Sequence, residues 1–251
     1  MVDFVGAGCG AADLITLRGM KILQEADVMI YAGSLVNPEL PEYAKDGCEI
    51  HNSAEMTLEE IIDIMRKAEA EGKHTVRLQT GDLSLYGALR EQTDRLDELG
   101  IAYRVTPGVS SMFGAASALK AEYTLPGVSQ SVIITRMAGR TEVPERESIE
   151  SFAAHGCTMV IFLSAGMTAE LSERLIRGGC APETPAAIVY KATWEDEKIM
   201  RCTVGKLHET ALANGIKKTA LIIVGNVLGS DFELSKLYDK TFETEFRKAQ
   251  K

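Results

Sequence analysis

Three short segments place glycine and small polar residues directly after an apolar run, where exposed backbone N–H groups can bind a ligand. They are VGAGCGAADLITLRG (residues 5–19), LQTGDLSLYG (78–87) and RVTPGVSSMFGAASAL (104–119). If the preceding runs are parallel strands, the three turns lie at one rim of the sheet, where open α/β sheets bind ligands. The sequence therefore predicts a binding cleft at this rim.

The first segment has the glycine spacing of a dinucleotide-binding loop, because Gly6, Gly8 and Ala11 satisfy G-x-G-x-x-G/A. Two further requirements of that loop fail. Thr16 is typical of a helix N-cap, so the next helix begins too late to hold a pyrophosphate, and the nearest acid, Asp27, precedes the second strand instead of ending it. We interpret the glycines as a sterically open turn that another group approaches, with a plain connecting turn as the alternative.

The second and third segments add side chains that could contact a ligand. Asp82 stands where a strand ends and a helix is expected to begin near Ser84, so a carboxylate and free N–H groups lie together, although Asp82 could simply cap that helix. Ser110 and Ser111 offer hydroxyl groups at the start of the following helix.

Composition excludes several classes of function. The 251-residue chain has 27 Lys+Arg against 36 Asp+Glu and a net charge of -9, which opposes binding to nucleic acid or to an anionic membrane surface. Five widely spaced cysteines predict neither a disulfide framework nor a metal site. We see no signal peptide and no long apolar segment, so we expect a cytoplasmic protein.

The first half of the sequence alternates short apolar runs with amphipathic stretches, which is typical of an α/β fold with a mainly parallel sheet. A capping box of Thr57 and Glu60 starts a helix that Gly72 stops. Two further helices are expected over residues 83–100 and 110–121. The expected strands are residues 2–7, 26–33, 74–81 and 101–108.

The second half restarts the pattern after a connection at residues 120–131, so we expect an N-terminal domain over 1–120 and a C-terminal domain over 121–251. Residues 197–207 alternate in polarity close behind an apolar strand, which predicts an antiparallel pair and a mixed sheet. The other expected strands are 130–136, 158–164, 186–193 and 219–228, and the expected helices are 167–179 and 206–215.

Five ordered motifs resemble those of the tetrapyrrole methylases that use S-adenosylmethionine, over residues 2 to about 228. They are VGAGCGAADLITLRG, YAGSLVNPEL, GDLSLYG, TPGVSSMFGAASAL and TLPGVSQSVIITRMAGRTEVPE. The second and fifth are most similar to the subgroup that methylates precorrin-4 or cobalt-precorrin-4 at ring carbon 11 in cobalamin synthesis.

The resemblance implies a two-domain α/β homodimer that holds the methyl donor between its domains and the anionic tetrapyrrole in an adjoining trough. It implies donor contacts at Gly81, Asp82, Leu85, Ser110, Ser111, Leu163, Ala192 and Ala220. It also implies that the turn containing Gly8 and Cys9 faces the trough. Cys9 and Leu83 stand where prolines are common in the family. Without the fixed φ angle of proline, the two turns that contain them are less restricted, which could lower the affinity for the donor.

Methyl transfer from a sulfonium to a ring carbon is an in-line displacement that needs alignment and exclusion of water, so it requires no metal or nucleophilic triad. The substrate's carboxylates need local cations, and Arg136, Arg140 and Arg146 share one predicted loop, with Arg146 best interpreted as a solvated residue. No general base is assigned.

Three alternatives remain open at the level of sequence. They are a methylase of another precorrin carbon or of uroporphyrinogen III, a nicotinamide-dependent reductase, and a non-catalytic tetrapyrrole binder. No residue indicates whether the substrate already carries cobalt.

Overall fold

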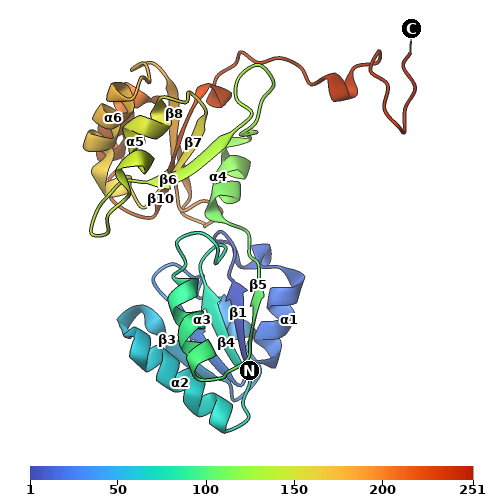
Figure 1. Ribbon diagram of the computed structural model, residues 1–251, viewed down its shortest axis with the longest axis vertical. Coiled ribbons are helices and arrows are strands. Elements are labelled where there is room, and N and C mark those ends of the chain that lie inside the picture. The colour runs from blue at the N-terminus through green and yellow to red at the C-terminus, as the bar shows by residue number, and fades with distance from the viewer. Residues whose placement is uncertain (251) are drawn as a thin grey trace. The chain divides into compact units, whose positions relative to one another are not determined.

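A five-stranded parallel sheet forms the first part of the computed structural model, which describes residues 1–250 (Figure 1). Its strand order is β3-β2-β4-β1-β5, and every neighbouring pair is parallel. The strands are β1 (Val2–Gly6), β2 (Val28–Tyr31), β3 (Glu49–Asn52), β4 (Thr75–Gln79) and β5 (Tyr103–Thr106). The predicted parallel sheet is confirmed, and β3, a mostly exposed edge strand, was not expected.

Side chains on alternate strand positions separate two apolar cores, one on each face of this sheet. Phe4 and Ile30 pack with the helices α2 and α3, whereas Val5 and Met29 pack with α1. Figure 1 shows α1 on the opposite side of the strands from α2 and α3. The helices are α1 (Leu17–Glu25), α2 (Leu58–Ala70), α3 (Leu89–Glu98) and α4 (Ser111–Leu119).

Two local predictions about helix starts are confirmed. Thr16 caps α1, where its side chain accepts a hydrogen bond from the backbone N–H of Gly19 at 3.0 Å. Thr57 and Glu60 form the predicted reciprocal capping box of α2. Both motifs depend on residues only three positions apart, so the sequence displays them directly.

The expected helix over residues 83–100 is wrong in its first half, because α3 begins only at Leu89. Tyr86 and Ala88 have φ values of 55° and 49°, in the left-handed region that stops a right-handed helix from forming. The Asp82 side chain also accepts a hydrogen bond from the N–H of Ser84, which stabilises a turn in place of the first helical turn.

A mixed five-stranded sheet with order β6-β7-β10-β8-β9 forms the second part, as predicted. The pair β6–β7 is parallel, and β10 is antiparallel to both β7 and β8. The strand β9 lies beside β8, as the alternating polarity of its sequence predicts. The strands are β6 (Val132–Arg136), β7 (Thr158–Phe162), β8 (Pro185–Tyr190), β9 (Lys198–Thr203) and β10 (Ala220–Val224).

Three helices pack with the second sheet around one further core. They are α5 (Ile149–Ala153), α6 (Thr168–Arg177) and α7 (Leu207–Ala213). Ile161, Leu171 and Ile188 are fully buried in that core. The five-residue helix α5 was not expected, because a helix this short carries little periodicity.

Contacts between Cα atoms divide the chain into two compact units. The first unit contains Met1–Ala118 together with Lys191–Lys198, and the second contains Leu119–Tyr190 and the described residues from Ile199 onward. The segment 191–198, between β8 and β9, therefore packs with the first unit. Within residues 1–250, no helix combines the length and the apolar character needed to span a bilayer.

Candidate functional site

The three glycine turns of the first unit meet backbone to backbone at the carboxyl ends of β1, β4 and β5. Gly8 and Gly81 exchange two hydrogen bonds, with N···O distances of 3.3 and 2.9 Å. A Cβ atom on Gly6 would lie 2.5 Å from the backbone N of Gly108, and one on Gly108 would overlap the carbonyl oxygen of Gly81. The group that approaches the first glycine turn is thus the protein's own backbone.

Asp82 links the second turn to the third. One carboxylate oxygen accepts hydrogen bonds from the backbone N–H of Ser84 at 2.9 Å and from its hydroxyl, and the other accepts from the N–H of Gly108 at 2.9 Å. Burial raises the pKa of Asp82, but these hydrogen bonds outweigh that effect and hold the pKa below its ordinary value. The carboxylate is therefore ionised at neutral pH and fixes the relative position of two turns.

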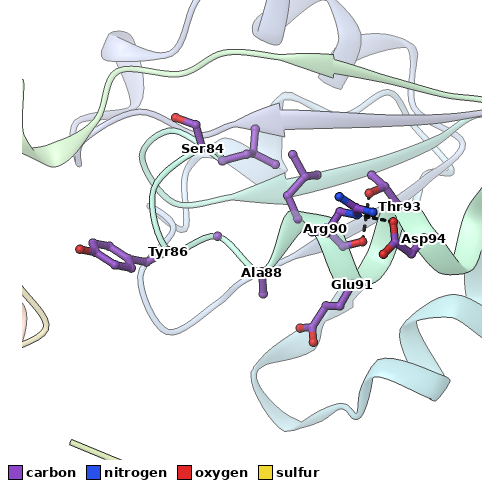
Figure 2. Close-up of a pocket in the computed structure, with 10 residues that line it drawn as sticks. Ser84, Tyr86, Ala88, Arg90, Glu91, Thr93 and Asp94 are labelled. Carbon is purple, nitrogen blue, oxygen red and sulfur yellow. Dashed lines mark hydrogen bonds and ion pairs between the residues drawn. The ribbon is translucent and has the colours of Figure 1, made fainter. Parts of the chain in front are cut away.

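A hollow of about 690 Å³ lies beside the second turn and the start of α3 (Figure 2). Arg90 pairs with Asp94 at its wall, and Tyr86 points away from the start of α3. Gly81, Asp82 and Leu85 are not among its lining residues. The hollow and the predicted donor contacts are thus different surfaces of the same turn.

Ser110 and Ser111 occupy the start of α4, where the sequence predicts them. Ser110 is buried, and its hydroxyl accepts a long hydrogen bond of 3.4 Å from the N–H of Met112, whereas Ser111 is half-buried. The α carbon of Ser110 would lie 3.7 Å from a Cβ on Gly81, and the backbone N of Ser111 would lie 3.8 Å from it, so the second and third turns bring Gly81 and the two serines together.

The segment 191–198 covers the first glycine turn. Thr193 Oγ1 accepts a hydrogen bond from the N–H of Ala11 at 3.0 Å and donates to Cys9 Sγ at 3.6 Å. A Cβ on Gly10 would lie 2.5 Å from Trp194 Cδ1. No sequence pattern indicates this role of Thr193, because hydrogen bonds between residues about 180 positions apart leave no local signal.

The same packing buries Gly8, Cys9 and Ala192. Cys9 and Ala192 are only 5% and 6% exposed, so their side chains present little surface to a ligand. Contact of Cys9 with the substrate and of Ala192 with the donor stays a prediction. The demonstrated role of both residues is to join the first turn to the segment that covers it.

In the second unit, Leu163 follows β7 as an exposed leucine in a left-handed conformation. Its φ is 52° and it is 66% exposed. The next residue fixes this backbone, since Ser164 Oγ donates to the carbonyl of Phe162 at 2.6 Å and accepts from the N–H of Met137 at 2.9 Å. The structure thus leaves the Leu163 side chain accessible, and its contact with the donor stays a prediction. Ala220, at the start of β10, is half-buried.

The predicted basic loop follows β6, and its arginines have different surroundings. Arg136 donates to the carbonyl oxygens of Met137, Thr141 and Glu142 at 3.1, 3.1 and 2.8 Å, so its guanidinium closes the loop on itself. Arg140 is exposed at the loop's tip. The side chain of Arg146 is 86% exposed and lies 3.7 Å from Glu147, in keeping with a solvated residue.

Across residues 1–250, no group of three or more His, Cys, Asp or Glu side chains could hold a metal ion. What the described residues offer instead is a set of narrow backbone turns, one fixed carboxylate and an exposed leucine. The turns could contact a ligand through main-chain atoms, and the leucine could contact one through its apolar side chain.

A parallel sheet with these turns, followed by a mixed sheet, defines a known class of protein. The chain belongs to the tetrapyrrole (corrin/porphyrin) methylases, whose family model matches residues 1–208. The resemblance of the five motifs is thereby confirmed.

Particular members of the family are similar over nearly their whole length. The cobalt-precorrin-4 C(11)-methyltransferase of Methanocaldococcus jannaschii is 55% identical, over 100% of this chain and 97% of that protein. A precorrin-4 C(11)-methyltransferase from a Sinorhizobium species is 45% identical, over 98% of each chain.

Two solved structures extend the comparison to three dimensions. The X-ray structure of a cobalt-precorrin-4 methyltransferase matches with a TM-score of 0.89 and 45% identity, covering 91% of this chain and 96% of that one. A uroporphyrin-III C-methyltransferase from Thermus thermophilus, complexed with S-adenosylhomocysteine, matches with a TM-score of 0.75 and 26% identity, covering 91% and 93%.

Proposed function

We propose that this protein transfers a methyl group from S-adenosylmethionine to ring carbon 11 of precorrin-4 or cobalt-precorrin-4 in cobalamin synthesis. The observation that carries the proposal is the meeting of the turns at Gly6, Gly81 and Gly108, which Asp82 fixes at the carboxyl ends of three parallel strands. Full-length relatives that are 55% and 45% identical carry the names of this activity and support the choice of substrate.

The donor is held, in this proposal, by residues of both units. Gly81, Leu85 and the two serines at the start of α4 border the donor, with hydroxyl groups from the serines, and Leu163 supplies an apolar contact. Asp82 acts as a positioning residue, because both of its oxygens already accept hydrogen bonds within the turns. Ala192 and Ala220 complete the proposed set.

S-adenosylmethionine supplies an electrophilic methyl group on a sulfonium, and displacement at that carbon needs a straight line from the sulfur to the ring carbon. The glycine turns let the three main-chain segments pack closely, since a side chain at Gly6 or Gly108 would displace neighbouring main-chain atoms. Turns fixed by Asp82 keep this geometry constant. Surrounding apolar residues such as Leu163 exclude water from the reacting atoms.

The tetrapyrrole carries several carboxylates, and the exposed Arg140 is the residue that we propose binds one of them. Arg136 contributes by holding the loop that presents Arg140. We also propose that Gly8 and Cys9 border the substrate. The protein consists, in this proposal, of domains at residues 1–120 and 121–251. It acts in the cytoplasm as a homodimer.

The decisive experiment measures methyl transfer from S-adenosylmethionine to precorrin-4, cobalt-precorrin-4 and uroporphyrinogen III in parallel, with product mass determined by mass spectrometry and the methylated carbon by NMR. We expect one added methyl group at carbon 11, and the faster acceptor identifies the physiological substrate. Transfer to uroporphyrinogen III alone would assign the alternative methylase activity. Donor binding without transfer to any acceptor would indicate a non-catalytic binder.

A further inference from the structure

The last twenty described residues, 231–250, form a carboxyl-terminal arm rich in exposed apolar side chains. Leu234, Tyr238 and Phe246 are 83%, 83% and 91% exposed, and the arm's other large apolar residues are exposed as well. Those others are Phe232, Leu237 and Phe242. In Figure 1 the arm is the red segment, whose regular structure is limited to short turns.

The arm is folded locally although it has no apolar core of its own. The guanidinium of Arg247 donates to the carbonyl oxygens of Leu237, Asp239 and Phe242 at 2.8, 2.7 and 3.3 Å. Main-chain hydrogen bonds from Gln250 to Lys240 and between Thr244 and Arg247 add to this fold. We call residues 237–250 the hook.

The root of the arm is attached to the second unit. The N–H of Glu233 donates to the carbonyl oxygen of Pro126 at 3.2 Å, and the Glu233 side chain packs over Gly127. A fixed root and a preorganised hook reduce the entropy that the arm would lose on docking. Apolar side chains displayed on such a scaffold are suited to binding another protein surface.

We propose that the arm docks onto a second copy of this chain, with each copy giving its arm to the other. This inference rests on the homodimer included in the proposed function and names the segment that holds the dimer together. Reciprocal exchange of identical arms closes a two-fold assembly and leaves no arm free to recruit further copies.

The apolar surface of the arm is large enough for this role. A whole aromatic side chain can bury about 200 Å². With the exposed fractions of the six apolar residues, one arm offers on the order of 700 Å². Two arms then bring roughly 1,400 Å² to the dimer, within the range of stable protein interfaces even before the receiving surfaces are counted.

The charge of the arm, and its presence in a full-length relative, also favour a second copy of this chain as the partner. The arm carries five acidic and four basic residues, so it approaches a copy of this acidic chain with little repulsion. The family model ends at residue 208, so the arm lies outside the region that defines a tetrapyrrole methylase. The 55% identical M. jannaschii protein nevertheless aligns with the full length of this chain, arm included.

The test uses the full-length protein and a variant with Leu234→Ser, Tyr238→Ser and Phe246→Ser together. Molar mass is measured by light scattering during size-exclusion chromatography over a wide range of protein concentration. We expect a dimer for the unchanged protein, and a dimer dissociation constant at least about a hundredfold higher for the variant, because truncation of buried anchors is costly. The variant should keep its circular dichroism spectrum and its affinity for S-adenosylhomocysteine.

Two further variants sharpen the test. Leu17→Ser with Leu212→Ser removes two leucines of comparable exposure outside the arm and should leave the dimer unchanged. Arg247→Ala removes the Nη2 donor to all three carbonyl oxygens and so loosens the hook, which should weaken the dimer about tenfold.

The outcomes separate this inference from the proposals on which it rests. A dimer that the triple serine variant leaves unchanged would overturn the role of the arm while keeping the homodimer. An unchanged protein that is monomeric at every concentration would overturn both. Methyl transfer is assayed separately, so neither result alters the assignment of the reaction.

Discussion

Asp82 is the side chain that fixes two turns of the proposed donor site. Its two oxygens hold the turn after β4 and the turn after β5 in fixed register, through Ser84 and Gly108. Such a carboxylate preserves the arrangement of neighbouring N–H groups, which is what donor binding needs.

We therefore expect Asp82→Ala to weaken S-adenosylhomocysteine binding by about tenfold or more, since loss of hydrogen bonds to a charged group costs roughly 1.5–3 kcal/mol. Isothermal titration calorimetry measures this change, and circular dichroism shows that the variant is folded. Asp94→Ala, which removes an exposed carboxylate from the same unit, is the matched control and should bind normally. Normal donor binding by the Asp82 variant would reduce Asp82 to a turn-capping residue.

Arg140 is the residue at which substrate and donor binding should separate. Its side chain stands exposed on the loop that Arg136 closes. Arg140→Ala should raise the dissociation constant of the tetrapyrrole severalfold to tenfold, because one charge-assisted hydrogen bond is lost, and should leave donor affinity intact. Fluorescence quenching titrations with each ligand test this.

Arg146→Ala is the control for that experiment, because Arg146 is a solvated residue of the same stretch. Equal weakening of both ligands by Arg140→Ala, or of neither, would remove Arg140 from the proposed site. A similar effect of both arginine variants would indicate a general effect of charge.

At the scale of elements, the strand-end turns require glycine because main chain packs on main chain. A Cβ on Gly108 would lie 2.8 Å from both the C and Cα atoms of Gly6 and would overlap the Gly81 carbonyl. We expect Gly108→Ala to lower the free energy of unfolding by about 1–3 kcal/mol, the usual cost of overpacking. Urea denaturation measures this loss.

Gly139→Ala provides the comparison for Gly108→Ala. A Cβ on Gly139 would have its nearest neighbour, the Met167 methyl group, at 3.9 Å, which is ordinary contact. The unfolding free energy of the Gly139→Ala variant should stay within about 0.5 kcal/mol of that of the unchanged protein. Equal stability of the two variants would show that the turns can separate at little cost.

Leu163 directly follows β7, and its left-handed backbone and exposed side chain are better suited to binding a ligand than to stabilising the fold. Leu163→Gly should change the unfolding free energy by less than about 1 kcal/mol, because relief of the left-handed strain offsets the flexibility of glycine. Donor affinity should fall about tenfold with the loss of an apolar contact.

Leu212→Ala is the matched control for Leu163, because Leu212 is a similarly exposed leucine of the second unit. Calorimetric titration with S-adenosylhomocysteine and urea denaturation of both variants supply the two readouts. A Leu163 variant that loses stability but keeps its donor affinity would contradict the proposed contact.

At the scale of the whole molecule, proposed donor residues occur in both units, with Ser110 and Ser111 in the first and Leu163 and Ala220 in the second. Ligand at a hundred times its dissociation constant should stabilise the units that bind it by about 2.7 kcal/mol. Hydrogen exchange monitored by mass spectrometry should therefore show slower exchange in both units when S-adenosylhomocysteine is added. Protection confined to one unit would remove the other unit's residues from the site.

The sequence by itself predicted most of the strands and helices, because periodicity and capping are local properties, but it did not predict the edge strand β3, the short helix α5 or the late start of α3. Thr16 and the Thr57–Glu60 box marked helix starts correctly, and five motifs identified the family. The sequence also predicted that the glycine spacing of residues 6–11 is not a dinucleotide-binding loop, because the Thr16 cap places the start of α1 too far from the glycines.

Only the tertiary structure decided how distant residues act on one another. It showed that Gly108 receives the Asp82 side chain and that Thr193 joins the first glycine turn from across the sequence. It also showed that the guanidinium of Arg136 donates its hydrogen bonds to carbonyl oxygens of its own loop. Hydrogen bonds of this kind depend on which chain segments meet in space, and no spacing along the sequence encodes that meeting.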